Sequence, residues 1–212
     1  MRRTIAFFAS ALTLGVASAL GVAQDFSADV VFVDGNVNAG PAKADTSSRN
    51  QNPSRIYVSN DKMRLEVGGP AGTVLLVNGT DQTAFAILPA KKQYERLAGG
   101  VSEYFRVNDA QDACPDWQKA SVLKVDCEKL GEEIVDGRQT VKYRNRTASD
   151  MAISAVWIDP KLKFVVKWEG AGKGAEFRNI QEAKHAAELF QLPSNFDLSR
   201  PLKGTSKGFS NR

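Results

Sequence analysis

The side chains best suited to chemistry in this sequence are two cysteines, Cys114 and Cys127, and a single histidine, His185. A redox-active cysteine pair has closer spacing, commonly two intervening residues, and a metal site needs more ligands than these three side chains supply. In an exported protein, an even pair of cysteines close in sequence most often forms a disulfide. We therefore expect a structural disulfide between Cys114 and Cys127, closing a ring of about 14 residues and contributing roughly 3 kcal/mol in the chain-entropy model.

No combination of residues has the pattern of a catalytic site. His185 is followed by two alanines and has no nearby partner of the kind that nucleophilic or acid–base catalysis needs. The adjacent Glu132 and Glu133 would point to opposite faces of a strand, which argues against joint acid–base work. The sequence contains no nucleophile elbow, phosphate-binding loop or clustered metal ligands. It therefore predicts a protein that is not an enzyme, with no catalytic residues and no cofactor or metal site.

The first 23 residues have the layout of a secretory signal peptide. Two arginines follow the first methionine, an apolar run begins at Ile5, and a small-x-small triplet ends at Ala23. Cleavage after Ala19 and an uncleaved membrane anchor are the alternatives, although the run is barely long enough to span a bilayer. No cysteine near the cleavage site could take a lipid. We expect a periplasmic or secreted protein with no stable membrane span after signal cleavage.

The length of the chain indicates a single domain after the predicted signal peptide. Its charge gives no electrostatic argument for binding to nucleic acid. The chain has 212 residues and a net charge of +4, of which the two arginines of the predicted signal peptide supply half. The remaining Lys and Arg are scattered along predicted strands, so we expect no nucleic-acid partner. We assign residues 24–198 to a single β domain and residues 199–212 to a flexible polar tail.

The clearest structural pattern is a predicted hairpin over residues 155–169, AVWIDPKLKFVVKWE. Its apolar residues alternate with other residues on both sides of a turn at Asp159-Pro160-Lys161, and alternation with period two marks strands with one buried face. Pro160 fixes its own backbone angle and favours a chain reversal. A hairpin this apolar needs a larger antiparallel sheet to bury its Trp and Phe side chains.

Further strands are predicted on the N-terminal side of this hairpin. Residues 25–34 form the first, residues 55–97 form a meander of four or five antiparallel strands, and residues 122–147 contain two more. Between them, residues 97–121 predict one or two short helices, held by the proposed disulfide. The polar loop at residues 35–54 is either a functional lid or, as we favour, a tolerated surface insertion.

Several of these segments occur in an order that resembles a known superfamily. As they stand in the sequence, the segments are YVSNDKMRLE, KKQYERL, LGEEIVDGRQTVKYR, VWIDPKLKFVVKWE and LFQLPSNF. Together they resemble the lipoprotein-carrier-like superfamily of periplasmic proteins, which includes the carriers that localise outer-membrane lipoproteins, and most closely its small uncharacterised domains. The resemblance covers residues 25 to about 196, and its most specific parts are Val156-Trp157-Ile158-Asp159-Pro160 and Phe190-x-Leu192-Pro193.

This resemblance implies a fold that is mainly β with short helices. The antiparallel sheet would be strongly curved into a half-open barrel, with short helices lying against its concave face as a lid. In the carriers, the cavity between sheet and lid holds acyl chains. Strands that are apolar on both faces, such as residues 74–77, fit that shape, as they fit any sheet covered by helices.

Two functions follow as hypotheses. The first is an exported cell-envelope carrier or binding protein that holds a lipid or lipidated partner in an apolar cavity. The second is a non-enzymatic structural or sensing domain of the envelope that docks a protein partner. A carrier needs an apolar cavity of several hundred Å³, so the presence or absence of such a cavity distinguishes the two hypotheses. The residues expected to line it, each of which has ordinary core packing as its alternative, are Phe32, Leu65, Leu75, Phe85, Trp157, Phe164, Val166 and Trp168.

Overall fold

Twelve strands form a single sheet in the computed structural model, which describes residues 25–34, 54–69, 72–97, 105–120, 125–147, 154–170 and 172–199. The chain is therefore mainly β, as the sequence predicts. The predicted signal peptide, most of the 35–54 loop and the tail beyond residue 199 lie outside the described residues. The strands are β1 (Phe26–Asp34), β2 (Ser54–Ser59), β3 (Lys62–Val67), β4 (Thr73–Asn78), β5 (Thr83–Leu88), β6 (Gln93–Leu97), β7 (Val125–Val135), β8 (Arg138–Thr147), β9 (Ser154–Asp159), β10 (Phe164–Gly170), β11 (Lys173–Glu182) and β12 (Asp197–Leu198).

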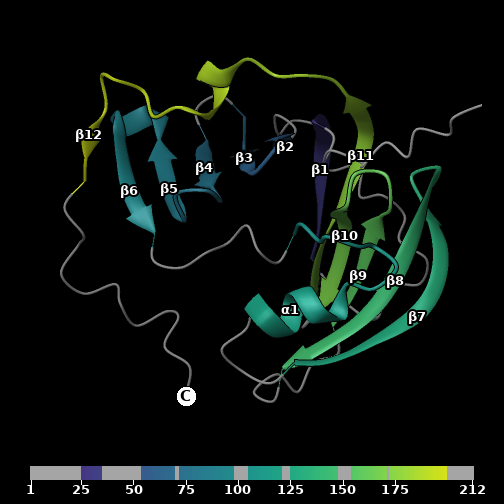
Figure 1. Cartoon of the computed structure of the whole chain (residues 1–212). Helices are drawn as coiled ribbons and strands as arrows, with labels where there is room; N and C mark the ends of the chain where they lie inside the picture. Colours follow the sequence, from purple (N-terminus) through teal and green to yellow (C-terminus); the bar gives the residue numbers. More distant parts are fainter. Residues whose placement is uncertain are drawn as a thin grey trace, which may run out of the picture.

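The sheet is open, with β12 at one edge and β7 at the other (Figure 1). Its order is β12-β6-β5-β4-β3-β2-β1-β11-β10-β9-β8-β7, and all neighbours are antiparallel except β12 and β6. The predicted meander is confirmed as β2 to β6. β1 joins it to the second half of the sheet by pairing with both β2 and β11. The long β7–β8 ribbon curves strongly at its end of the sheet.

The β9–β10 hairpin has the predicted turn, and a buried carboxylate holds it. Asp159 is 2% exposed, and its Oδ1 accepts the backbone N–H groups of Lys161 and Leu162 at 2.8 and 3.1 Å. Its Oδ2 accepts a hydrogen bond from the Arg138 guanidinium on β8. Arg138 also donates to the Glu182 carboxylate at the end of β11, at 2.8 Å. The sequence Asp159-Pro160 therefore forms a turn that is fastened to two other strands.

The Glu182 carboxylate predicts a loss of stability in acid. Its bond to Lys161 and its bond to Arg138 lower the pKa of Glu182, although partial burial opposes the shift. Since the folded pKa lies below the unfolded value of about 4.3, this stabilisation is present above that pH and is lost as pH falls through the folded pKa.

We expect Glu182→Gln to lower the free energy of unfolding by about 1 kcal/mol at pH 7. The difference from the native protein should shrink toward zero in acid, as measured by urea unfolding at stepwise lower pH. Glu188→Gln is the matched control, because Glu188 is exposed and has no ion pair among the described residues. A Glu182→Gln effect that is the same at every pH would contradict the role of its charge.

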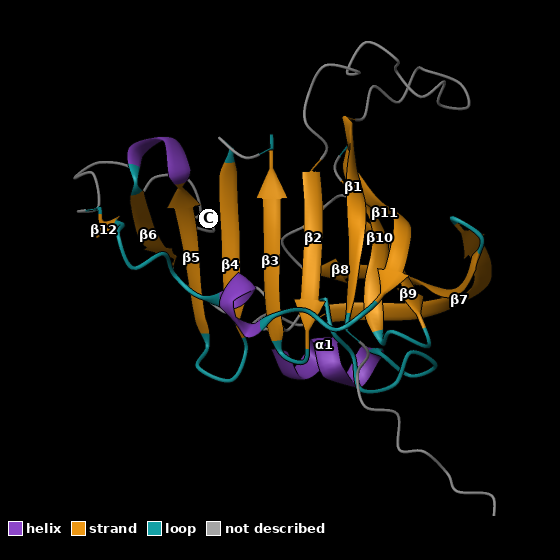
Figure 2. Cartoon of the chain, turned by 90° about the horizontal axis from the view of Figure 1, so that it is seen from above, coloured by secondary structure: helices purple, strands orange, loops and turns teal. Residues whose placement is uncertain are grey.

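The two faces of β2 contact different apolar clusters. Ile56 and Val58 belong to the main core, which contains residues of the five strands β1 through β5 and of β10 and β11. Tyr57 lies on the other face and packs in a second cluster with Phe190. Phe190 belongs to the 3₁₀ helix Ala187–Phe190, in the segment that runs from β11 back across β2–β5 to β12 (Figure 2). The C-terminal segment thus covers the face of the meander opposite the main core.

The α-helix α1 (Cys114–Ala120) covers part of the second half of the sheet. Pro115 and the acidic Asp116 lie in its first turn, where both residue types favour a helix start. Its buried Trp117 packs edge-to-face on Tyr143 of β8, with ring centroids 5.4 Å apart. The Tyr143 hydroxyl donates to the Ala110 carbonyl at 3.0 Å. Of the one or two short helices predicted within residues 97–121, α1 is confirmed, while residues 98–104 lie outside the described part of the chain.

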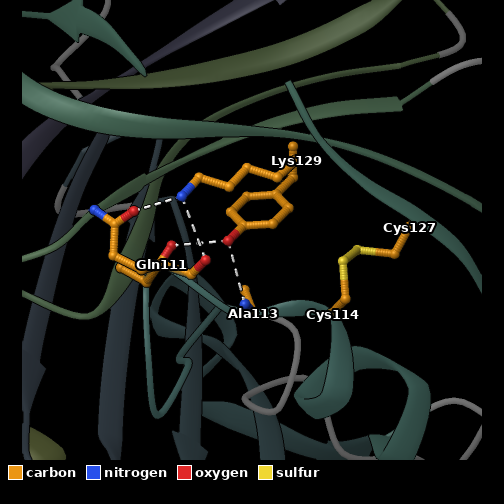
Figure 3. The surroundings of a disulfide bond; sticks show 7 residues. Gln111, Ala113, Cys114, Cys127 and Lys129 are labelled. Carbon is orange, nitrogen blue, oxygen red and sulfur yellow. Dashed lines mark hydrogen bonds between the residues drawn. A yellow bond between two sulfur atoms is a disulfide. The ribbon is translucent and has the colours of Figure 1, made fainter. Parts of the chain in front are cut away.

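The predicted disulfide is present and joins the start of α1 to β7 (Figure 3). Beside it, the Lys129 ammonium of β7 donates to the Gln111 side chain at 2.5 Å. The covalent bond and this contact fasten the segment before α1 to the edge strand.

Within the described part of the chain, no helix has the length and apolar character needed to cross a bilayer.

Removal of this disulfide should weaken the fold measurably. We expect the double variant Cys114→Ser and Cys127→Ser to lose about 3 kcal/mol, because the ring of about 14 residues no longer restricts the unfolded chain. Denaturant unfolding measures this loss. Intact-mass analysis of the native protein should show two hydrogens fewer than the reduced chain. Two free thiols, or an unchanged unfolding midpoint in the double variant, would contradict the structural role.

Candidate functional site

A pocket of about 370 Å³ lies where the β2–β3 turn, the start of β10 and helix α1 meet. Its volume falls in the range of small-molecule sites. One part of the lining is apolar and is formed by Val58, Met63, Val107 and Phe164. The polar and charged part is formed by Asn60, Asp61, Lys62, Arg106, Asn108, Asp116 and Lys119, with Gly79 and Ala120 completing the wall. The pocket therefore has both an apolar and a charged side.

Phe164 forms the apolar centre of the site. Its ring meets Phe26 edge-to-face at a centroid distance of 5.3 Å and stacks with Phe105 at 6.0 Å. Phe177 of β11 completes the group at 6.3 Å. Such aromatic pairs stabilise the fold by more than the burial of their area alone. Phe164 thus gives the pocket an apolar wall that is held by three other aromatic rings.

The guanidinium of Arg106 lies over the Phe164 ring, 5.6 Å from its centroid. Its terminal nitrogens Nη1 and Nη2 are buried and have no hydrogen-bond partner among the described residues. Burial lowers the pKa of Arg106, while the negative charges of Asp25 and Asp61 act in the opposite direction. Arginine remains charged in proteins, so the site holds a positive charge with no direct counter-ion among the described residues.

Backbone pairing fixes the position of Arg106. The Val107 N–H donates to the Lys163 carbonyl at 3.0 Å, and the Val165 N–H donates to the Phe105 carbonyl at 2.7 Å. Residues 105–107 therefore add a short antiparallel bridge to the start of β10. This bridge carries Arg106 to the edge of the main core, beside Phe164.

The two carboxylates that line the pocket are already bound to neutral donors. Asp116 accepts both the backbone N–H and the side-chain amide of Asn108, each at 2.7 Å. Asp61 accepts the Thr80 backbone N–H at 2.6 Å and also the Thr80 hydroxyl. Burial opposes ionisation of Asp61, but these bonds outweigh it and lower the pKa of Asp61. Both carboxylates therefore stabilise the neighbouring loops through these hydrogen bonds.

A second pocket, of about 420 Å³, lies on the other side of the β2–β3 turn. It is lined by polar residues of the β2–β3 and β4–β5 turns and by His185. The His185 ring packs edge-to-face on Tyr57 at 5.5 Å and lies 6.4 Å from Phe190, and its Nε2 is buried with no partner in the described part. Within the described ranges, no three His, Cys, Asp or Glu side chains gather to hold a metal ion.

Of the eight residues expected to line a cavity, only Phe164 lines the 370 Å³ pocket. Four others, Leu65, Leu75, Val166 and Trp168, belong to the main core or pack against it. Leu65 and Leu75 are directly paired across β3 and β4. These four residues share a core with Phe164 but do not form the pocket wall.

The other three expected residues lie elsewhere. Phe32, near the end of β1, is 48% exposed. Phe85 packs against Tyr94 at 5.8 Å in the cluster beneath the C-terminal segment. Trp157 lies on the face of β9 opposite Val156 and Ile158, and the ammonium groups of Lys142 and Lys167 lie 4.7 and 4.5 Å from its ring. Alternation alone could not tell which face of each strand meets the pocket.

Sequence reasoning missed the charged side of the pocket. Arg106, Lys62 and Lys119 are far apart in the sequence and match no motif. Arg106 stands directly between Phe105 and Val107, and a charged residue flanked by an aromatic and an apolar residue was the one available signal. The pairing of residues 105–107 with β10 is a long-range contact that local patterns do not encode.

Comparisons with known proteins show a shared fold and no family. No protein-family model matches the sequence, and no curated protein matches it. A solved structure, an uncharacterized conserved protein from Thermus thermophilus, superposes with a TM-score of 0.50 at 12% identity, covering 85% of this chain and 92% of that one. At this identity the likeness shows the fold alone.

Two other solved structures are more distant. The MucA/MucB complex of Pseudomonas aeruginosa contains a chain that matches with a TM-score of 0.45 at 16% identity, over 84% of this chain and 58% of that one. A Vibrio parahaemolyticus domain described as an outer membrane lipoprotein-sorting protein matches with a TM-score of 0.26 at 12% identity, over 81% and 89%. At these TM-scores neither match carries information on what this chain binds.

Proposed function

We propose that this protein is an exported binding protein of the cell envelope that holds a lipid, or the lipid group of a modified partner, in the 370 Å³ pocket. The observation that carries the proposal is the pocket itself, in which the Phe164 ring, Val58 and Met63 form an apolar side next to a charged one. Apolar pockets bind alkyl chains by removing apolar surface from water, at about 25 cal/mol per Å². In this proposal α1 acts as the lid of a half-open barrel formed by the sheet.

The proposal includes export and cleavage of residues 1–23. Residues 24–198 would then form the mature binding domain, and residues 199–212 a flexible polar tail. Disulfide formation between Cys114 and Cys127 supports this location, because disulfides persist in oxidising compartments. N-terminal sequencing of the exported protein should begin at residue 24, and retention of the full N-terminus would contradict this part.

The ligand can be sought directly. Protein purified without detergent, extracted with organic solvent and analysed by lipid mass spectrometry should yield a stoichiometric lipid or acyl species. Incubation with membrane extract before purification covers a ligand lost during isolation. A blank in both experiments would contradict the lipid-binding function.

A pocket-filling variant locates the binding site. Ala120 at the end of α1 lines the pocket and is half-buried, so Ala120→Trp should occupy part of its volume and reduce the bound lipid at least several-fold. The matched control is Ala90→Trp, because Ala90 is exposed and lies outside the pocket. Equal lipid content in both variants would contradict binding at this site.

A second candidate function is docking of a protein partner, and the edge strand β7 favours it. β7 has 11 residues, pairs only with β8 among the described strands, and carries Ile134 with 72% of its surface exposed. An unpaired edge can accept an extended segment of another protein. A photo-crosslinker at position 134 should then give one discrete adduct in cells, while the same group at exposed Gln118 should not.

A further inference from the structure

We infer that the ligand of this pocket carries an anionic group, a carboxylate or a phosphate, that binds Arg106, with Lys62 and Lys119 at the rim. The inference rests on the proposed function, since it names the chemistry of the group that accompanies the apolar part. The positions and contacts of the charged residues in the pocket support this inference.

The first step is the state of Arg106. A buried cation is costly unless it is paired, and the great majority of buried polar groups in proteins have a hydrogen-bond partner. Both terminal nitrogens of Arg106 lack one in the described structure. The ring of Phe164 below the guanidinium compensates only part of this cost. An anion from outside the chain would supply the missing acceptor.

The second step is that the neighbouring carboxylates do not fill this role. Asp116 gives both oxygens to Asn108, and Asp61 is held by Thr80. Asp25 accepts from the Ser59 hydroxyl and from the Asn60 N–H. Asp25 and Asp61 act on the pKa of Arg106 through space, and none of these three acids forms an ion pair with it in the described structure.

The third step is the gathering of unpaired cations. Most arginines of the described sheet have a carboxylate partner, as Arg55, Arg64 and Arg138 do. The two lysines that line the pocket, Lys62 and Lys119, form no ion pair with any described carboxylate, and neither does Arg106. Three unpaired positive charges around one pocket attract an anion and orient it.

The fourth step is the shape of the ligand. The Arg106 guanidinium lies over the Phe164 ring, and a guanidinium can make bidentate contact with a carboxylate or a phosphate. Since both nitrogens are shielded from solvent, the Arg106 side chain would turn toward the pocket through a change of rotamer. The apolar part of the ligand would then lie against Phe164 and Met63. The matching class is an alkyl or acyl chain with an acidic head group.

Calorimetric titration with a matched set of probes tests this. The probes are dodecanoate, dodecyl phosphate, dodecanol and inorganic phosphate, at low ionic strength. We expect the two anionic amphiphiles to bind about 10-fold to 100-fold more tightly than dodecanol, because charge-assisted hydrogen bonds add to the same apolar contact. Inorganic phosphate should bind more weakly than dodecyl phosphate.

Variants assign the preference to Arg106. Arg106→Gln should abolish the preference, so that dodecanoate and dodecanol bind with equal affinity. Arg106→Lys should keep part of the preference. The control is Arg96→Gln, at an exposed site on β6 away from the pocket, which should behave as the native protein.

Each outcome bears on a different claim. Equal binding of dodecanoate and dodecanol to the native protein would overturn the anionic head group and leave the lipid-binding function standing. A preference that survives Arg106→Gln would overturn the role of Arg106. Inorganic phosphate binding as tightly as dodecyl phosphate would overturn the amphiphile in favour of a free anion. Binding of none of the amphiphiles would overturn the proposed function and the inference with it.

Discussion

Trp117→Ala should lower the free energy of unfolding by about 3–5 kcal/mol, a large fraction of the stability of a domain of this size. Trp117 is 1% exposed and packs against Tyr143 within the cluster that joins α1 to β8, β9 and β10. Its removal leaves a cavity that the surrounding strands can only partly close. Since α1 also supplies Lys119 and Ala120 to the pocket, ligand affinity should fall together with stability.

Urea unfolding measures the loss in Trp117→Ala, and Gln118→Ala is the matched control. Gln118 is the next residue of the same helix and is exposed, so its replacement should change stability by less than about 0.5 kcal/mol. Similar values for the two variants would mean that α1 does not pack on the sheet as described.

Asp159→Ala should lower the free energy of unfolding by about 3–5 kcal/mol, because it breaks a buried ion pair and removes the acceptor of two N–H groups in the β9–β10 turn. The N–H groups of Lys161 and Leu162 lose their side-chain acceptor, and Arg138 keeps only Glu182. Asp159→Asn should lose less, since its amide oxygen can still accept one or both N–H groups.

The control for Asp159→Ala is Glu128→Ala. Glu128 forms an ion pair with Arg144 in which both side chains are largely exposed, and such pairs contribute about 1 kcal/mol or less. Chemical unfolding of the three variants ranks them directly. A Glu128→Ala loss as large as that of Asp159→Ala would contradict the role of burial in this network.

The β strands were predictable because their signal is local. Alternation around Asp159-Pro160 predicted the β9–β10 hairpin, and short apolar runs within residues 55–97 predicted the meander. The disulfide followed from the spacing of Cys114 and Cys127 together with the predicted export signal. Each of these features depends on residues close together in the sequence.

The pocket was not predictable in the same way, because its parts meet only in the folded chain. Trp157 was expected to line the cavity, but alternation could not show that its buried ring packs against the Lys142 and Lys167 ammonium groups and lies outside the pocket lining. Arg106 reaches Phe164 through a bridge between segments far apart in sequence. The C-terminal strand β12 is two residues long and pairs in parallel with β6, which leaves no periodic signal.

The most direct test of the central claim is a map of backbone amide chemical shifts during titration with dodecanoate. The account predicts shifts that gather at the β2–β3 turn, at Arg106 to Asn108, at the end of α1 and at Phe164, the segments that line the 370 Å³ pocket. Residues of the β7–β8 ribbon far from α1 should be unaffected. Shifts centred on that ribbon or on the C-terminal segment, with none around Arg106, would contradict the assignment of this pocket as the binding site.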